Sequence, residues 1–258
     1  MTLHATARRL LLGVPGIGAG AYGLPAGQAP KLRQDPLATP RRRVLNGALV
    51  RRGLGSPLSP QNGHRALLQV ITDLSGSMWG GNDAAGLRHE ALLILAEHLA
   101  SLARGSRVPW FLQVISFDTD SPFDVGPIPL DRRRVTELAR HLLARESGGS
   151  SCLGPSLASA SASASAWDGP VALCVLSDFE LLDNDPASVL RRFVFTPADA
   201  RVAVVFRSPV PAELDPNAVI LRHVDPITDP AESVATFLWD AVRSLAGEVV
   251  DPVEASVR

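Results

Sequence analysis

Cysteine is scarce in this chain of 258 residues, which contains only Cys152 and Cys174. Two cysteines cannot build a disulfide framework, and no paired-cysteine or Cys/His cluster indicates a zinc site. The chain also lacks an uninterrupted run of about eighteen apolar residues, which excludes a transmembrane helix. Hydrophobic residues make up 46% of the chain and charged residues 20%, so a folded globular protein is expected rather than a disordered one.

Acidic and basic residues are unevenly distributed along the chain. Residues 1–60 contain nine basic residues and one acidic residue, Asp35, which gives this segment a net charge of +8. The totals are 25 basic and 26 acidic residues, so residues 61–258 hold 16 basic and 25 acidic residues and a net charge of −9. We therefore divide the chain into a basic N-terminal arm, 1–60, and an acidic domain, 61–258.

The arm is rich in proline and glycine and has no sustained helical or strand period. It is expected to be irregular, with a short helix over 41–52. A GxGxxG pattern runs from Gly18 to Gly23, but dinucleotide binding needs a strand before this pattern and a helix after it. Pro25 follows almost at once, so a glycine-rich coil is the better interpretation.

The start of the arm has some features of an export signal. Arg8 and Arg9 precede three leucines, in the manner of a twin-arginine signal, but Pro15 interrupts the apolar stretch and the cleavage site is poor. We therefore expect a cytoplasmic protein and retain export as the alternative. The arm contains only one aromatic residue, Tyr22, for stacking on bases, so we expect no nucleic-acid partner.

From residue 66 onward, short apolar runs alternate with segments of helical period. Strands are predicted over 66–73, 110–117, 171–177, 202–207 and 219–224, with a candidate edge strand over 123–130. Helices are predicted over 84–104, 131–145, 186–193 and 230–246. The Ala/Ser-rich segment 156–166 is either a helix packed close to a sheet or a linker. This order predicts a three-layer α/β fold, in which a mostly parallel sheet has helices on both faces.

Polar residues collect where the predicted strands end, which is where parallel sheets bind ligands. Three segments contribute: the one after the first strand, the loop before the Ala/Ser-rich segment, and the one after strand 171–177. The candidate ligands in them are Asp73, Ser75, Ser77, Ser150, Ser151 and Asp178. Their carboxylates and hydroxyls are hard oxygen donors, which suit Mg²⁺, Mn²⁺ or Ca²⁺ better than zinc or copper. The alternative is that Asp73 or Ser75 simply caps the next helix.

The histidines and cysteines do not belong to this set of candidate metal ligands. We expect the scattered residues His64, His89, His98 and His141 to lie at the surface. Cys174 falls in the middle of a predicted strand and should belong to the core. Cys152 adjoins the candidate ligands but has no neighbouring base to activate its thiol.

The D-x-S-x-S pattern of Asp73, Ser75 and Ser77, placed directly after an apolar strand, resembles the von Willebrand factor A (vWA) family. The Gly-Gly-Thr loop of that family aligns with residues 149–157, which makes Ser151 the counterpart of the threonine and Ser150 a one-residue alternative. The second aspartate of the family matches Asp178. The resemblance spans about residues 64–247 and leaves the arm unexplained.

The resemblance implies a Rossmann-like vWA domain of bacterial type with a metal-ion-dependent adhesion site. By this resemblance Ser75 and Ser77 ligate Mg²⁺ directly, with Mn²⁺ or Ca²⁺ as alternatives. Asp73 and Asp178 act directly or through water, and Ser151 joins in one conformational state. The open coordination position accepts a carboxylate from a partner protein.

Two departures from the family pattern concern the surroundings of this site. Ser151 replaces a threonine, which keeps the oxygen but loses a methyl group that restrains the side chain. Phe179 stands where the family often has glycine, and Glu180, Asp183 and Asp185 follow it. We expect these three acidic residues to form a negatively charged rim around the site.

The function implied is that of a non-catalytic, metal-dependent protein-binding module in a multi-protein complex. A MoxR-type AAA+ ATPase is the partner that the resemblance suggests. One alternative is an exported adhesion protein. Another is a serine hydrolase that uses Ser75 or Ser77, but the chain has no G-x-S-x-G elbow and no histidine convincingly placed as a base.

Deleting the arm tests how it relates to the acidic domain. We expect residues 1–60 to pack against that domain, because leucines and valines recur between residues 37 and 50. The deletion should lower the midpoint of thermal unfolding and increase the fluorescence of a dye that binds exposed apolar surface. If the arm is a free anion-binding tail, both stay unchanged and salt-sensitive binding to polyanions is lost.

Overall fold

A computed structural model describes residues 65–78, 82–83, 86–103, 109–117, 123–143, 151–229, 231–247, 250 and 253–254. The strands within these residues are β1 (Ala66–Asp73), β2 (Trp110–Phe117), β3 (Phe123–Pro129), β4 (Val171–Ser177), β5 (Ala200–Phe206), β6 (Ile220–Val224) and β7 (Val253–Glu254). The helices are α3 (Leu87–Ala103), α4 (Arg132–Leu143), α5 (Gly154–Ser165), α6 (Pro186–Phe195) and α7 (Ala231–Leu245). The arm, its expected helix over 41–52 and the boundary at residue 60 lie outside the described residues.

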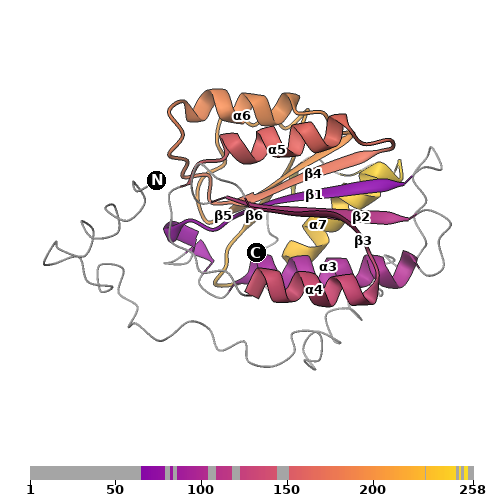
Figure 1. Cartoon of the computed structure of the whole chain (residues 1–258). Coiled ribbons are helices and arrows are strands. Elements are labelled where there is room, and N and C mark those ends of the chain that lie inside the picture. Colours follow the sequence, from indigo (N-terminus) through magenta and orange to yellow (C-terminus); the bar gives the residue numbers. More distant parts are fainter. Residues whose placement is uncertain are drawn as a thin grey trace, which may run out of the picture. The chain divides into compact units, whose positions relative to one another are not determined.

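All seven described strands belong to one sheet, in the order β3-β2-β1-β4-β5-β6-β7. Neighbouring strands are parallel except β2 and β3, which are antiparallel. Helices α5 and α6 cover one face of the sheet, and α3, α4 and α7 cover the other (Figure 1). The three-layer α/β fold with a mostly parallel sheet is therefore confirmed.

The predicted elements agree with the observed ones to within a few residues at their ends. The strands are covered on both faces, which is why they appear in the sequence as continuous apolar runs. All eight residues of β1 are buried, and Cys174 is buried in β4 as expected. The Ala/Ser-rich segment forms helix α5 and is not a linker. Strand β7 was not predicted, because two residues are too few to give a periodic signal.

Polar side chains connect helix α5 to the sheet beneath it. The buried Gln69 amide donates to the carbonyl of Ala160 at 2.9 Å and to Oε1 of Gln113 at 2.8 Å. The Gln113 amide in turn donates to Ser163 Oγ at 2.9 Å and to the carboxylate of Asp124. Small side chains on α5 leave room for these contacts. These hydrogen bonds hold α5 close to the sheet. The first turn of α5 follows the loop that contains Ser151.

Strand β3 forms one edge of the sheet and carries few groups that could pair with another strand. Pro127 and Pro129 have no backbone N–H to donate, and the register with β2 shifts between Leu112 and Val114.

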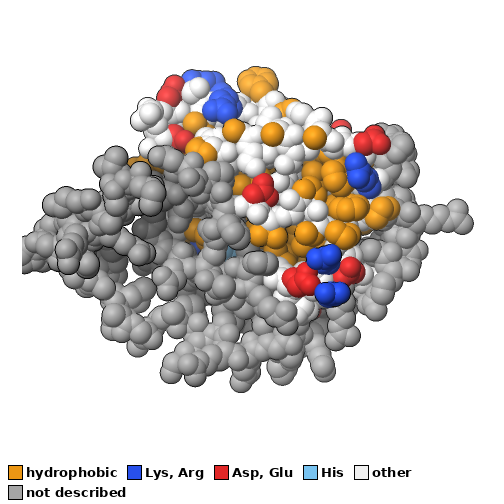
Figure 2. Space-filling view, viewed as in Figure 1, with side chains coloured by type: hydrophobic (Ala, Val, Ile, Leu, Met, Phe, Trp, Pro, Cys, Tyr) orange, Lys and Arg blue, Asp and Glu red, His pale blue; other side chains and the backbone are white. Residues whose placement is uncertain are grey.

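Figure 2 shows hydrophobic side chains on the viewed face of the molecule beside a group of acidic and basic ones. The exposed ion pairs of Arg133 and Arg134 with Glu137 lie on α4, the helix that follows this strand.

Two histidines expected at the surface are buried. His89 and His98 are each 5% exposed, because α3 packs against the sheet, α4 and α7 at once. The His98 ring meets that of Trp239 edge to face, with 4.9 Å between ring centroids. Burial, together with the charge of Arg88, lowers the pKa of His89 well below its usual value. His64 and the side chain of His141 lie outside the described residues.

A buried ion pair joins the sheet to α7. Arg222 of β6 donates from Nε to Oδ2 of Asp240 at 2.9 Å, and both side chains are almost fully buried. Arg243, one turn further along α7, approaches the other oxygen of Asp240.

No helix in the described part of the chain combines the length and apolar composition needed to cross a bilayer.

Removing one partner of this buried pair should destabilise the fold strongly. Asp240→Ala should lower the free energy of unfolding by about 3–5 kcal/mol, because the charge of Arg222 stays buried without its partner. Glu137→Ala is the matched control, because it breaks exposed ion pairs that contribute at most about 1 kcal/mol. Denaturant titrations of both variants measure the difference, and equal losses would contradict this assignment.

Candidate metal centre at the carboxyl edge of the sheet

The order of the strands creates a switch point between β1 and β4. The chain runs from β1 to β2 and β3 on one side, and then crosses to β4 on the other side of β1. Parallel α/β sheets bind ligands beyond the carboxyl ends of their strands at such a point. Asp73 ends β1, and Asp178 directly follows β4. The topology therefore brings two of the predicted segments together.

Asp73 connects the three predicted segments through its two carboxylate oxygens. Oδ1 accepts a hydrogen bond from the backbone N–H of Ser75 at 2.8 Å. Oδ2 accepts from Ser177 Oγ at 2.6 Å and from Ser151 Oγ at 3.3 Å. Asp73, Ser75, Ser151 and Ser177 are all buried. The alternative residue Ser150 lies outside the described residues.

The second carboxylate, that of Asp178, is also buried and is held by two donors. Oδ2 accepts from the side-chain amide of Asn82 at 2.8 Å, and Oδ1 accepts from the backbone N–H of Glu180 at 3.0 Å. Neither donor was expected from the sequence. Asn82 lies in a glycine-rich stretch with no recognisable pattern. It belongs to the segment that follows β1 in the sequence, and its amide orients the Asp178 carboxylate.

The hydroxyls of Ser75 and Ser77 lie side by side, with 3.0 Å between their Oγ atoms. In an octahedral Mg²⁺ shell with ligands at about 2.1 Å, adjacent ligands are about 3.0 Å apart. The two hydroxyls are therefore already spaced as neighbouring ligands of one ion. Ser77 is half-buried, whereas Ser75 is buried, so the pair lies at the boundary between the protein interior and solvent.

Electrostatics also favour a cation at this place. Burial raises the pKa of Asp73 above its ordinary value, and hydrogen bonds from Ser177 and Ser75 oppose the increase. The negative charge of Asp178 raises the pKa of Asp73 further. The two buried carboxylates are thus close enough to repel each other. A divalent cation between them would replace this repulsion with attraction.

Residues 76–78 are helical directly after Ser75, so capping of that turn stays the alternative role of Asp73 and Ser75, whereas α3 has a cap of its own. The first turn of α3 is capped by Asp83, whose carboxylate accepts from the backbone N–H groups of Leu87 at 2.7 Å and Arg88 at 3.2 Å. Asp83 is buried and also forms an ion pair with the Arg88 side chain. Asp73 does form a local turn with Ser75, but its second oxygen contacts residues that are far away in the sequence.

Of the three acidic residues expected at the rim of the site, Glu180 and Asp185 are exposed, and Asp183 and Asp185 also serve as helix caps. Asp183 accepts from the backbone N–H groups of Leu153 at 2.8 Å and Gly154 at 3.0 Å, at the start of α5. Asp185 caps α6 through the N–H of Ser188. Positive helix N-termini compensate both charges. Of the three, only Glu180 is an exposed acid without such a role.

Phe179, which stands where glycine was expected, adopts the left-handed backbone conformation that glycine favours. Its φ is 58°, and its side chain is 8% exposed, packed in the apolar cluster under α5 and α6. Its N–H donates to Ser177 Oγ at 2.8 Å. Ser177 therefore connects the strained residue to Asp73. The sequence pattern alone did not identify Ser177, although its place before Asp178 at a strand end was a signal.

The donors gathered here are two carboxylates and three hydroxyls, from Asp73, Asp178, Ser75, Ser77 and Ser151. Among the described residues, no group of three or more histidine, cysteine, aspartate or glutamate side chains is arranged to hold a metal ion. The hard oxygens of the present set fit Mg²⁺, Mn²⁺ or Ca²⁺, provided that waters and an outside ligand complete the shell.

Solved structures with a similar fold include a von Willebrand factor type A protein from Catenulispora acidiphila. It matches with 18% identity and a TM-score of 0.50, over 70% of this chain and 43% of its own. The pilus adhesin SpaC from Lactobacillus rhamnosus GG, in its open conformation, matches with 11% identity and a TM-score of 0.55, over 72% of this chain and 30% of its own. BatB from Bacteroides thetaiotaomicron matches with 14% identity and a TM-score of 0.50, over 71% of this chain and all of its own.

At these identities the likeness concerns the fold. This chain has the vWA fold, and its match spans less than half the length of the first two of these proteins. No protein-family model and no curated protein matches the sequence.

Proposed function

We propose that this chain is a non-catalytic, protein-binding vWA domain that holds a divalent cation at the carboxyl edge of its sheet. The observation that carries the proposal is the convergence of three separate segments on the Asp73 carboxylate. Mg²⁺ is the ion we favour, with Mn²⁺ or Ca²⁺ as alternatives. The vWA fold, which typically serves protein interaction, supports the same conclusion.

The residues of the site would contribute to ion binding in different ways. Ser75 and Ser77 would be direct ligands, because their hydroxyls are adjacent. Both oxygens of Asp73 already accept hydrogen bonds, so it would orient the hydroxyls of Ser151 and Ser177 and contribute its charge. Asp178, held by Asn82, would supply the second negative charge. When bound, the ion supplies an electrophilic position for an outside carboxylate.

The partner we propose is a protein that presents an aspartate or glutamate to this position, within a multi-protein complex. A MoxR-type AAA+ ATPase is a candidate that rests on the sequence resemblance alone, as do the bacterial type and the cytoplasmic location. The fold similarity to a pilus adhesin keeps the exported adhesion protein as the alternative. N-terminal sequencing of the native protein distinguishes the two, because export through a signal peptide removes the first residues.

A hydrolase remains the weaker proposal. The Ser75 hydroxyl bonds to that of Ser77, and the described residues provide neither serine with a histidine partner. His98 lies in α3 with its ring against that of Trp239. Ester and phosphate hydrolysis that is lost in Ser75→Ala would overturn the non-catalytic assignment.

Thermal unfolding with and without Mg²⁺ tests the proposed site. An ion that binds only the folded state at a hundredfold excess over its Kd stabilises it by about 2.7 kcal/mol. The wild-type protein should therefore unfold at a higher temperature in Mg²⁺, and Ser77→Ala and Asp178→Asn should reduce the shift.

Asp168→Asn is the matched control for Asp178→Asn. It removes the same charge from an exposed residue just before β4, at the opposite edge of the sheet, and should keep the full shift. A wild-type protein whose unfolding temperature does not respond to millimolar Mg²⁺, Mn²⁺ or Ca²⁺ would contradict the metal site.

A further inference from the structure

Exposed apolar side chains gather at the same edge of the sheet as the candidate metal centre. Among the described residues, the large hydrophobic side chains with the greatest exposure are Leu182 at 67%, Phe195 at 80%, Val210 at 40% and Ile227 at 76%. Leu182, Val210 and Ile227 lie in the loops after β4, β5 and β6, respectively. Phe195 instead ends α6, which runs back toward the opposite edge.

Hydrogen bonds hold these loops in place. The N–H of Leu182 donates to the carbonyl of Ser151 at 2.8 Å, which connects this side chain to the metal centre itself. The N–H of Ile227 donates to Asp225 Oδ1 at 3.0 Å, and Asp229 accepts from the N–H of Asp225 at 2.8 Å. The exposed side chains are therefore presented by ordered turns.

Backbone strain occurs at the same edge. The non-glycine residues with positive φ in the described part of the chain are Phe179 at 58°, two residues after the end of β4, and Arg207 at 61°, directly after β5. Strained residues of this kind persist where the surrounding structure holds them, and they cluster at binding sites. Arg207 is exposed, and no ion pair within the described residues engages it. It places a cation at the start of the loop that carries Val210.

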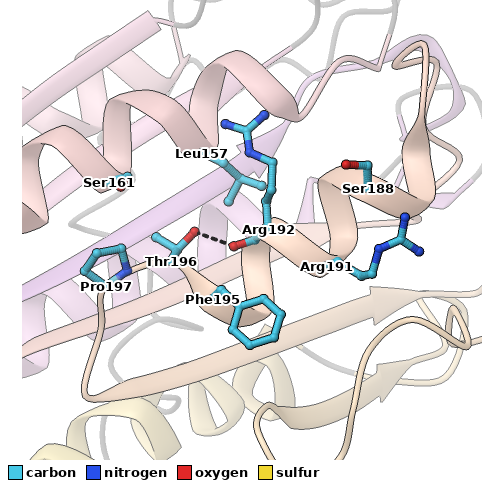
Figure 3. Close-up of a pocket in the computed structure, with 8 residues that line it drawn as sticks. All are labelled: Leu157, Ser161, Ser188, Arg191, Arg192, Phe195, Thr196 and Pro197. Carbon is cyan, nitrogen blue, oxygen red and sulfur yellow. Dashed lines mark hydrogen bonds between the residues drawn. The ribbon is translucent and has the colours of Figure 1, made fainter.

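The groove between α5 and α6 is a weaker candidate for a docking surface. It has a volume of about 430 Å³ and is lined in part by Arg191, Arg192 and Phe195. Figure 3 shows Arg192 extending toward α5 beside Leu157, whereas Arg191 and Phe195 extend away from it. The polar groups do not converge on one point, so we use this surface as a control.

We propose that the binding interface extends from the metal centre along the loops after β4, β5 and β6, and that it takes an extended acidic and apolar segment of a partner protein. This inference rests on the proposed function, since the acidic residue of the segment occupies the open metal position. The apolar residue then covers Leu182 and Ile227. Arg207 is the one basic residue of these three loops, which also carry acidic residues such as Glu180 and Asp225, so binding of the acidic anchor depends on the metal ion.

The sheet sets the spacing between these two anchors. Neighbouring strands are about 4.8 Å apart, so the distance from the middle of β1 and β4 to β6 is about 12 Å. An extended peptide advances about 3.3 Å per residue, so its acidic and apolar anchors should be about three to four residues apart.

Fluorescence anisotropy with labelled synthetic peptides tests this interface on the full chain. One peptide carries a glutamate in a Gly/Ser background, the second adds a leucine four residues away, and the third replaces the glutamate of the second with glutamine. In Mg²⁺, the leucine should increase affinity about tenfold, as expected for partial burial of one such side chain. Ile227→Ser and Leu182→Ser should abolish this gain, whereas Phe195→Ser should retain it.

The outcomes separate the interface from the metal site. Binding of the glutamate peptide that depends on Mg²⁺ but gains nothing from leucine, or an equal loss in Phe195→Ser, overturns the interface and leaves the metal site intact. Equal binding of the glutamine peptide, or binding that survives EDTA and Ser77→Ala, overturns the proposed function. If no peptide binds, or if the protein dimerises in Mg²⁺ through Ile227, the proposed occupant is wrong.

Discussion

The buried carboxylate of Asp73 is the constraint on which the rest of the site depends. It ends the interior strand β1, is inaccessible to solvent, and accepts hydrogen bonds from Ser75, Ser151 and Ser177. A buried carboxylate is costly unless its oxygens are satisfied, so these three segments must stay together for the fold to be stable. The same contacts bring the backbone of Ser75 and the hydroxyl of Ser151 to one carboxylate, so the arrangement that stabilises the strand end also collects the proposed ligands of an ion.

The neighbouring loops follow from this arrangement. Asp183 ties the loop after β4 to the start of α5, and the backbone of Leu182 contacts Ser151. The charge of Asp183 is thereby compensated at a helix N-terminus, and the exposed residues of these loops include Glu180 and Asp185 as well as apolar side chains and Arg207. The apolar part of this surface suits a partner that presents an apolar group as well as an acidic one.

How far the sequence predicts this structure depends on the range of the interactions involved. Strands such as 110–117 were predicted correctly because both faces are covered, so the whole strand is apolar. The pairing of Asp73 with Asp178 followed from topology, since parallel strands end at one edge. The burial of His89 and His98 could not be read from α3, which is apolar on several sides and packs against three neighbours at once. Asn82 and Ser177 were missed because their roles depend on contacts between segments about a hundred residues apart.

The most direct test of a metal ion at the strand ends is paramagnetic broadening by Mn²⁺ in the nuclear magnetic resonance spectrum of the isotope-labelled protein. The account predicts that the backbone amide signals of Ser75, Ser77, Ser151 and Glu180 broaden first, at low Mn²⁺ concentration. The amide of Asp168, before β4 at the opposite edge, should remain sharp until much later in the titration. Broadening that starts at exposed acidic turns such as Asp215, or that affects all amides equally, would contradict a metal site at Asp73.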